Sequence, residues 1–268
     1  MRILVLVDRL NWAYHSIAIS LCKYNIDKDI QIDVMPIKGG APKIKKKYKK
    51  YDKYLVMGWQ TYDLVKFLPK EKTLIGIHSH HSWDDRKTEP GRDVRPPKRM
   101  IDFLNKFMGV NAVSNKLYNI FKKSGVKKIC YTPNGVDSSV FKPCTTRSCK
   151  DFYVGYSGSK SHDWRKGVSK YIIPSSKGAG VKTKIAMLST GNYVPLEQMP
   201  SFYSDLHAYI CASSSEGFSL SVLEAASCGV PIITTNVGGM SDLLKRHGYS
   251  IDVYRFNKYT KPLVIGTK

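Results

Sequence analysis

Short apolar runs alternate with helix-like stretches along the whole chain. In the first half, these runs predict strands at residues 3–7, 30–35, 53–57, 73–77, 110–113 and 129–132. Between the last two runs, Ser114 predicts the N-cap of a helix that ends at Gly125. Strands that alternate with helices are typical of a parallel sheet with crossover helices. The sequence therefore predicts an α/β fold.

The second half repeats this alternation after a stretch without periodicity. Residues 137–151 are rich in Ser, Thr, Pro and Lys, and we interpret them as an inter-domain linker. Further apolar runs predict strands at residues 152–156, 183–188, 208–211 and 231–234, with helices that begin near Gly167, Pro195 and Gly217. A length of 268 residues suits two modest domains. We expect Rossmann-like domains at residues 1–140 and 141–268.

The cysteines and the apolar runs bear on where the protein works. The six cysteines lack metal-ligand spacing, which favours reduced thiols in a cytoplasm, and a local pair of Cys144 and Cys149 is the alternative. No apolar run approaches the roughly 18 residues that a membrane span needs. The run at residues 3–7 is also too short for a signal-peptide core, so it predicts a buried strand. We therefore expect a cytoplasmic protein.

The net charge of +22 is unevenly distributed. Residues 1–150 contain 30 Lys and Arg against 13 Asp and Glu, a balance of +17. Such a field attracts anionic membranes, nucleic acids or anionic substrates, although a lysine-rich proteome would give the same composition. In the lysine run at residues 43–53, Ile44, Tyr48 and Tyr51 recur at helical spacing. This run indicates a solvated helix face or a basic patch for peripheral contact with a membrane.

The segment 213–231 carries the strongest chemical signal. Its carboxylates Glu216 and Glu224 lie eight residues apart across a small-residue turn and the first turns of a helix. A helix start leaves backbone N–H groups without intrahelical partners, and these groups with the helix dipole form an anion site that suits a diphosphate. Glu216 is placed to accept hydrogen bonds from sugar hydroxyls, and Glu224 to hold the two hydroxyls of a ribose. The alternative is a capping carboxylate followed by an exposed helical Glu.

This segment resembles the E-x7-E signature of retaining nucleotide-sugar glycosyltransferases of the family-4 type. That family has the GT-B fold, in which two Rossmann-like domains with parallel sheets face a central cleft. Other pieces over residues 73–245 fall in the family's order, namely Pro133-Asn-Gly-Val-Asp137, Val154-Gly155, Lys166-Gly167, Tyr193-Val-Pro-Leu196 and Val237-Gly-Gly-Met-Ser-Asp242. The resemblance implies transfer of a hexose from a UDP- or GDP-sugar with retention at the anomeric carbon. It implies neither a cofactor nor a metal ion.

The resemblance also assigns roles in the second half. It implies Glu216 near the donor sugar and Glu224 on the ribose, with backbone donors from Gly217, Phe218, Ser219 and Leu220. The family's diphosphate-neutralising Lys is matched by Lys166. Tyr156-Ser-Gly-Ser stands where the family's Arg is expected, and Arg165 or Lys160 is the candidate replacement. A plain solvated turn is the alternative for Arg165 and Lys166.

A histidine cluster follows the predicted strand at residues 73–77. The carboxyl ends of strands are where open α/β sheets bind ligands. A family histidine beside the donor sugar is best matched by His78, with His80 next. His80 and His81 are also candidates on the acceptor side. A His/Asp metal site and a structural histidine loop are the alternatives. Asn11 and Trp12, which stand where the family has a Gly pair, are further acceptor-side candidates.

Both predicted domains are short for this family, because only about 26 residues separate Lys166-Gly167 from Tyr193. The sequence thus predicts a shortened glycosyltransferase whose second domain binds the donor. Its basic first domain would bind a glycan, lipid or protein acceptor that is anionic or lies at an anionic membrane. A transferase that acts on nucleic acid, and a degenerate transferase kept as a sugar- or nucleotide-binding scaffold, are the alternatives. Against nucleic acid, no recognition motif is present.

Overall fold

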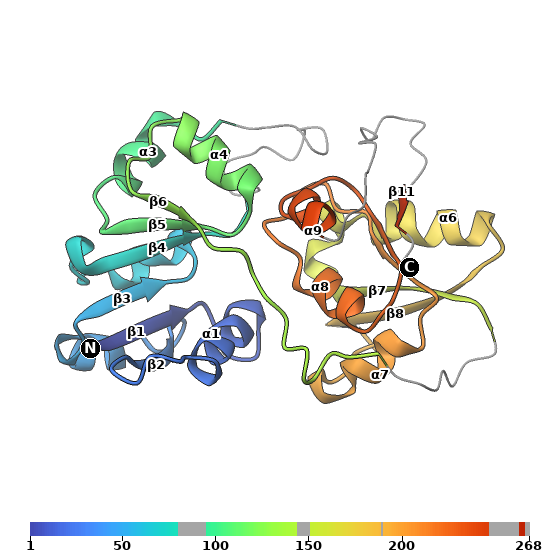
Figure 1. Ribbon diagram of the computed structural model, residues 1–268, viewed down its shortest axis with the longest axis horizontal. Helices are drawn as coiled ribbons and strands as arrows, with labels where there is room; N and C mark the ends of the chain where they lie inside the picture. The colour runs from blue at the N-terminus through green and yellow to red at the C-terminus, as the bar shows by residue number, and fades with distance from the viewer. Residues whose placement is uncertain (80–94, 144–150, 189, 247–262, 266–268) are drawn as a thin grey trace. The chain divides into compact units, whose positions relative to one another are not determined.

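The computed structural model describes residues 1–79, 95–143, 151–188, 190–246 and 263–265 (Figure 1). The chain folds into two compact units, and the division falls between Asn134 and Gly135. The predicted boundary at residue 140 lies slightly later, in the segment that follows this Asn-Gly turn. Each unit has its own sheet and its own core, and the two are described separately.

The first unit contains a parallel sheet with the strand order β2-β1-β3-β4-β5-β6 among the described residues (Figure 1). Its strands are β1 (Arg2–Val7), β2 (Gln31–Pro36), β3 (Lys53–Val56), β4 (Thr73–Ile77), β5 (Gly109–Ala112) and β6 (Ile129–Tyr131). Its helices are α1 (Ala13–Lys23), α2 (Ala41–Lys47), α3 (Lys98–Leu104) and α4 (Asn115–Lys123), with short 3₁₀ turns η1 (Tyr48–Lys50), η2 (Trp59–Val65) and η3 (Lys70–Lys72). Each predicted strand of the first half is therefore confirmed.

Burial explains why the strands of this sheet read as continuous apolar runs. Residues of β1 from Leu4 to Val7 are at most 1% exposed, because helices pack on the sheet. Helix α1 packs on β1 and β2 through Ala18, which shares a core with Val5 and Met57. Helix α4 begins at the predicted N-cap, where the Ser114 hydroxyl accepts a hydrogen bond from the amide of Leu117 at 3.2 Å.

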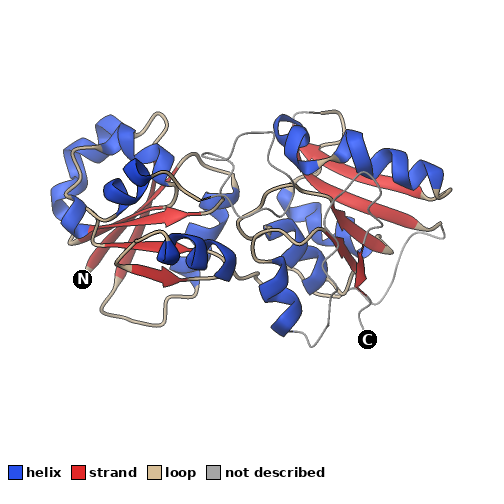
Figure 2. Ribbon diagram, turned by 90° about the horizontal axis from the view of Figure 1, so that it is seen from above, coloured by secondary structure: helices blue, strands red, loops and turns tan. Residues whose placement is uncertain are grey.

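The second unit is built on a sheet with the order β11-β10-β9-β7-β8 among the described residues. Strands β7 (Tyr153–Ser159), β8 (Lys182–Leu188), β9 (Ala208–Cys211) and β10 (Ile232–Thr234) are parallel, and β11 (Leu263–Ile265) pairs antiparallel with β10. The helical elements are η4 (Lys160–His162), α5 (Asp163–Lys166), the π-helix η5 (Val168–Ile172), α6 (Ile173–Gly178), η6 (Leu196–Gln198), α7 (Met199–Ser204), α8 (Leu220–Ser227) and α9 (Met240–Arg246). Figure 2 shows helices flanking the strands of this sheet.

The structure extends the sequence predictions in several places. The antiparallel edge strand β11 was not predicted, whereas the four parallel strands were. The lysine run forms α2 and η1, in which Ile44 is fully buried and the surrounding lysines are exposed. Among the described cysteines, Cys22, Cys130, Cys211 and Cys228 are free thiols, while Cys144 and Cys149 lie outside the described residues. No helix in the described part of the chain is long and apolar enough to cross a bilayer.

Candidate functional site

A buried carboxylate and two cations meet in the second unit. Glu216, in the loop between β9 and α8, is only 6% exposed. Its Oε1 accepts a hydrogen bond from the Lys166 ammonium, and the two groups form an ion pair. The same Oε1 lies 3.5 Å from Nη1 of Arg165. The Ser213 hydroxyl donates to the same oxygen at 2.7 Å. Residues fifty positions apart thus form one charge cluster with two positive groups and one negative group.

The local backbone brings these groups together. Helix α5 ends at Gly167, whose φ of +68° is the left-handed conformation that favours glycine. The Asp163 carboxylate accepts hydrogen bonds from the amides of Val168 and Ser169, which begin the next helical segment. The Arg165 carbonyl accepts a 2.7 Å hydrogen bond from the Ser214 amide, so the end of α5 is tied to the Glu216 loop. Arg165 and Lys166 are therefore part of the buried framework rather than a solvated turn.

The cluster keeps Glu216 ionised. Burial by itself would raise the pKa of this carboxyl, but attraction to Lys166 and Arg165, with hydrogen bonds from Lys166 and Ser213, holds it at about 2. Arg165 also donates from Nη1 to the Ser215 carbonyl at 2.8 Å, while its buried Nε has no hydrogen-bond partner among the described residues. Lys160, the other predicted cation, is exposed at the start of η4 and is not among the described ion-pair partners of Glu216.

Helix α8 begins at Leu220, and Gly217, Phe218 and Ser219 form the turn that leads into it. This turn is packed against the glycine loop at residues 237–239. The Gly239 amide donates to the Gly217 carbonyl at 2.7 Å. A Cβ atom on Gly238 would lie 2.2 Å from that carbonyl oxygen, and one on Gly239 would lie 2.1 Å from the Phe218 ring. The ring of Phe218 is therefore part of the packing, and a ligand at this turn would contact its backbone.

The second carboxylate of the pair, Glu224, lies one turn into α8 and is half-buried. The hydroxyl of Tyr203, from α7, donates to its Oε2 at 2.7 Å. Burial raises the pKa of Glu224, and the Tyr203 hydrogen bond opposes that rise. Oε1 accepts no hydrogen bond from the described residues.

In the first unit, polar groups gather at the carboxyl ends of β1, β3 and β4, which are neighbours in the sheet. Nε2 of His78, after β4, is buried and has no hydrogen-bond partner among the described residues. Its ring lies 4.6 Å from that of Tyr14, and burial lowers the pKa of His78 to about 4. Within the described residues, Asp8 Oδ1, after β1, and Trp59 Nε1, after β3, are also buried without partners. Unpaired buried polar atoms are costly in a folded protein, which makes this edge of the sheet a candidate ligand site.

Of the other residues predicted at this edge, Asn11 and Trp12 lie within the described part of the chain. Asn11 adopts a left-handed φ of +55°, and the Arg9 guanidinium stacks 3.7 Å from the Trp12 ring centroid. His80 and His81 lie outside the described residues, as does most of the segment of the alternative His/Asp metal site.

Sequence reasoning missed several residues of both groups. Tyr203, Ser157 and Tyr209 support Glu224 from α7, β7 and β9, and Tyr14 packs on His78 from α1. Buried tyrosines in apolar runs read as core residues, because their hydroxyl partners are far away in sequence. The spacing of Glu216 and Glu224 was visible, but their partners were not.

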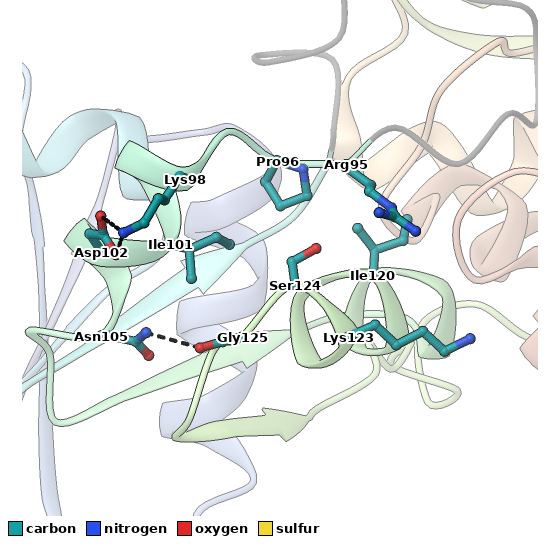
Figure 3. Close-up of a pocket in the computed structure, with 10 residues that line it drawn as sticks. All are labelled: Arg95, Pro96, Lys98, Ile101, Asp102, Asn105, Ile120, Lys123, Ser124 and Gly125. Atoms are coloured by element: carbon teal, nitrogen blue, oxygen red, sulfur yellow. Dashed lines mark hydrogen bonds and ion pairs between the residues drawn. The ribbon is translucent and has the colours of Figure 1, made fainter.

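A hollow of about 850 Å³ lies between α3 and α4 of the first unit (Figure 3). Arg95 and Lys123 extend at one end of it. At the other end the Lys98 ammonium hydrogen-bonds to both oxygens of Asp102, at 3.0 and 2.7 Å. The chain segment 95–128 that surrounds it contains nine Lys and Arg residues and one acidic residue, Asp102. The hollow is therefore set in a strongly basic surface.

Comparison with known proteins gives a family match within the second unit. Residues 169–259 match the family model of glycosyl transferases group 1. O-antigen chain mannosyltransferase B of Escherichia coli is 38% identical over 60 residues, which cover 22% of this chain and 16% of that protein. The gpi3 subunit of phosphatidylinositol N-acetylglucosaminyltransferase from Schizosaccharomyces pombe is 26% identical over 145 residues, 45% of this chain and 32% of that protein. The chain thus matches less than two thirds of the length of these curated relatives.

Among solved structures, sucrose-phosphate synthase from Thermosynechococcus elongatus is similar to this chain with a TM-score of 0.71. The two are 14% identical in sequence, and the match covers 91% of this chain and 83% of that one. The likeness concerns the fold, and it confirms the predicted α/β architecture of the GT-B type.

Proposed function

We propose that the chain moves a sugar from a nucleoside diphosphate sugar to an acceptor hydroxyl, because residues 169–259 match the family model of glycosyl transferases group 1. The reaction retains the configuration at the anomeric carbon, and the donor is a UDP- or GDP-hexose. The observation that carries the proposal is the cluster in which Glu216 forms ion pairs with Lys166 and Arg165. Glu216 lies eight residues before Glu224 in the sequence. The cluster places two cations beside the turn at residues 217–219.

These cations are proposed to stabilise the leaving group. In the transition state, positive charge develops on the sugar ring and negative charge on the departing diphosphate. Lys166 and Arg165 together exceed the charge of Glu216 by one, so a net positive charge remains for the diphosphate. Their side chains are 12% and 9% exposed, and in such partly desolvated surroundings a fixed charge acts more strongly than in water. We therefore propose that they act without a metal ion.

The donor would bind the second unit through groups already in place. Backbone amides of Gly217, Phe218, Ser219 and Leu220 stand at the start of α8, where the helix dipole favours an anion. Glu216 would accept hydrogen bonds from sugar hydroxyls, and Oε1 of Glu224 would accept those of the ribose. Lys160, exposed nearby in sequence, is proposed to add to the attraction of the diphosphate.

The first unit is proposed to supply His78 and the acceptor-side residues. His78 is uncharged near neutral pH, because burial lowers its pKa to about 4. A neutral imidazole with an unpaired Nε2 would orient a sugar hydroxyl by a hydrogen bond without adding positive charge. Asn11, Trp12, His80 and His81 remain proposals for the acceptor side.

The acceptor is proposed to be an anionic glycan, lipid or protein. The basic surface at residues 95–128 and its hollow support this proposal, because an anionic ligand or an anionic membrane would be drawn to that surface (Figure 3). Peripheral contact with a membrane would place a lipid-linked acceptor near the first unit.

The direct test is donor turnover. The chain is incubated with each of UDP-glucose, UDP-N-acetylglucosamine and GDP-mannose, and release of the nucleoside diphosphate is followed by proton NMR. We expect release with one donor, with the hydrolysed or transferred sugar appearing first as the anomer of the donor. Glu216→Gln should abolish release, whereas Glu197→Gln, which changes an exposed carboxylate of the same unit, should not.

Two other outcomes would contradict the proposal. Nucleotide binding without turnover of any donor would favour the degenerate scaffold. Appearance of the opposite anomer as the first product would refute retention while leaving the transferase itself in place.

A further inference from the structure

A chain of buried hydroxyl groups ends on Glu224. The Tyr203 hydroxyl donates to Glu224 Oε2 at 2.7 Å, and Ser157 Oγ lies 2.8 Å from the same hydroxyl. The Tyr209 hydroxyl in turn lies 3.2 Å from Ser157 Oγ. These residues come from α7, β7 and β9, so three separate elements support one side chain of α8.

The direction of the chain follows from counting protons. An ionised carboxylate is an acceptor only, so the single proton of Tyr203 is donated to Glu224. Ser157 must then donate its proton to Tyr203. The Tyr209 hydroxyl accepts a hydrogen bond from the Ser157 amide at 3.1 Å and donates to the Ser157 carbonyl at 3.2 Å, so it holds the backbone of Ser157 in place. The two bonds from Ser157 to Tyr203 and from Tyr203 to Glu224 therefore point the same way, and such aligned bonds strengthen one another.

Burial keeps this order fixed. Tyr203 and Tyr209 are at most 1% exposed, and burial raises the pKa of both hydroxyls, so both remain protonated near neutral pH. Tyr203 is held between neighbours, with its ring 6.1 Å from Phe141 and 5.5 Å from Phe202. A hydroxyl on so constrained a ring fixes the rotamer of the carboxylate that it contacts.

We infer that Tyr203, supported by Ser157, is a positioning residue that holds Glu224 as a fixed anionic acceptor for the ribose hydroxyls of the donor. The pair thereby sets the preference of the site for ribonucleotides over deoxyribonucleotides. This inference rests on the proposed function, because it takes Glu224 as the ribose-binding group. A purely structural Tyr203 would contribute packing alone.

The positioning role and the structural role predict different affinities of a Tyr203→Phe variant for nucleotides with and without ribose hydroxyls. The ring and its packing remain, and only the hydroxyl is lost. If Tyr203 positions Glu224, affinity for UDP or GDP falls about tenfold, the lower end of the range expected for one hydrogen bond to a charged group. Affinity for the 2′,3′-dideoxy nucleotide, which has no hydroxyls for Glu224, stays unchanged. The affinity for the ribonucleotide divided by the affinity for the dideoxynucleotide is therefore lower in the variant than in the wild type.

The experiment is titration calorimetry of the full chain with the preferred nucleoside diphosphate and its 2′,3′-dideoxy counterpart. Ser157→Ala should lower the same ratio by a smaller factor, and it keeps the test open if Tyr203→Phe fails to fold. Tyr156→Phe is the matched control, because Tyr156 is buried in the same unit and its hydroxyl has no hydrogen-bond partner among the described residues. In a Glu224→Ala background, Tyr203→Phe should have no further effect on the ratio.

Equal losses for both nucleotides in Tyr203→Phe, or an unchanged ratio, would overturn the inference and assign Tyr203 a structural role. If the wild-type chain binds the ribonucleotide but does not distinguish it from the dideoxy form, the inference is also wrong and the transferase proposal survives. If the wild-type chain binds no nucleoside diphosphate, both fail together.

Discussion

Replacing Glu216 by Gln tests the charge cluster of the second unit. In the wild-type protein the folded-state pKa of Glu216 is about 2, against a reference value of 4.5. A depressed carboxyl pKa stabilises the folded state above the reference value, and this stability is lost as the pH falls towards the folded-state value. The difference in pKa corresponds to about 3 kcal/mol at pH 7, since each unit is worth about 1.4 kcal/mol.

The same relation gives the pH dependence. At pH 3 the wild-type carboxyl retains about 1.4 kcal/mol of this contribution, so about 2 kcal/mol disappears between pH 7 and pH 3. Glu216→Gln has no such group, and it leaves the cations Lys166 and Arg165 without their buried partner. We expect the variant to be about 3 kcal/mol less stable at pH 7, and the gap to the wild type to narrow by about 2 kcal/mol at pH 3.

The assay is urea unfolding of both proteins at the two pH values, with tyrosine and tryptophan fluorescence as the signal. Glu197→Gln is the control, because that carboxylate is exposed and its replacement should change the stability little at either pH. A gap of the same size at pH 7 and pH 3 would refute the reasoning, because it would show that Glu216 is not held ionised by its neighbours.

Three further predictions concern the framework around the candidate residues. Gly238→Ala should destabilise the protein by more than about 2 kcal/mol in urea unfolding, because the residue has a φ of +54° and no room for a Cβ atom. The control Gly178→Ala should be neutral or slightly stabilising, because Gly178 lies in α6 with open space around it. Ser114→Ala should cost about 1 kcal/mol in the same assay through the lost N-cap of α4. Burial disfavours protonation of His78, so the free energy of unfolding of the wild type relative to that of His78→Phe should fall as the pH decreases from 6.5 to 4. A difference between the two free energies that stays constant with pH would contradict the buried, neutral state of His78.

Much of the fold could be predicted because its signals are local. The apolar runs that became β1 and β9 are buried on both faces, so each reads as a nearly unbroken apolar run in the sequence. The N-cap at Ser114 needs only the residue and the three that follow it. Strand β11 has no such signal, because a three-residue antiparallel edge strand is short and is defined by its partner β10.

The candidate groups were predicted less completely, since their geometry depends on residues far apart in sequence. The spacing of Glu216 and Glu224 pointed to a ligand, but pairing of Glu216 with Lys166 arises only when α5 is tied to the β9–α8 loop. Among the described residues, Glu216 forms ion pairs with Arg165 and Lys166 but not with Lys160, and this pairing likewise depends on the position of α5. Tyr203 carries no signal of its own, because a buried Tyr looks like any core residue until its hydroxyl partner is known. The roles of all these residues, and the central cleft, stay predictions.

The central claim is that Lys166 and the start of α8 bind a nucleoside diphosphate. Titration calorimetry of the wild-type chain and of Lys166→Met with UDP and GDP measures this directly. We expect one nucleotide to bind the wild type and Lys166→Met to weaken this binding by at least about tenfold, the effect of losing one charge-assisted contact. Binding of equal strength in the two proteins, or binding of neither nucleotide to the wild type, would contradict it.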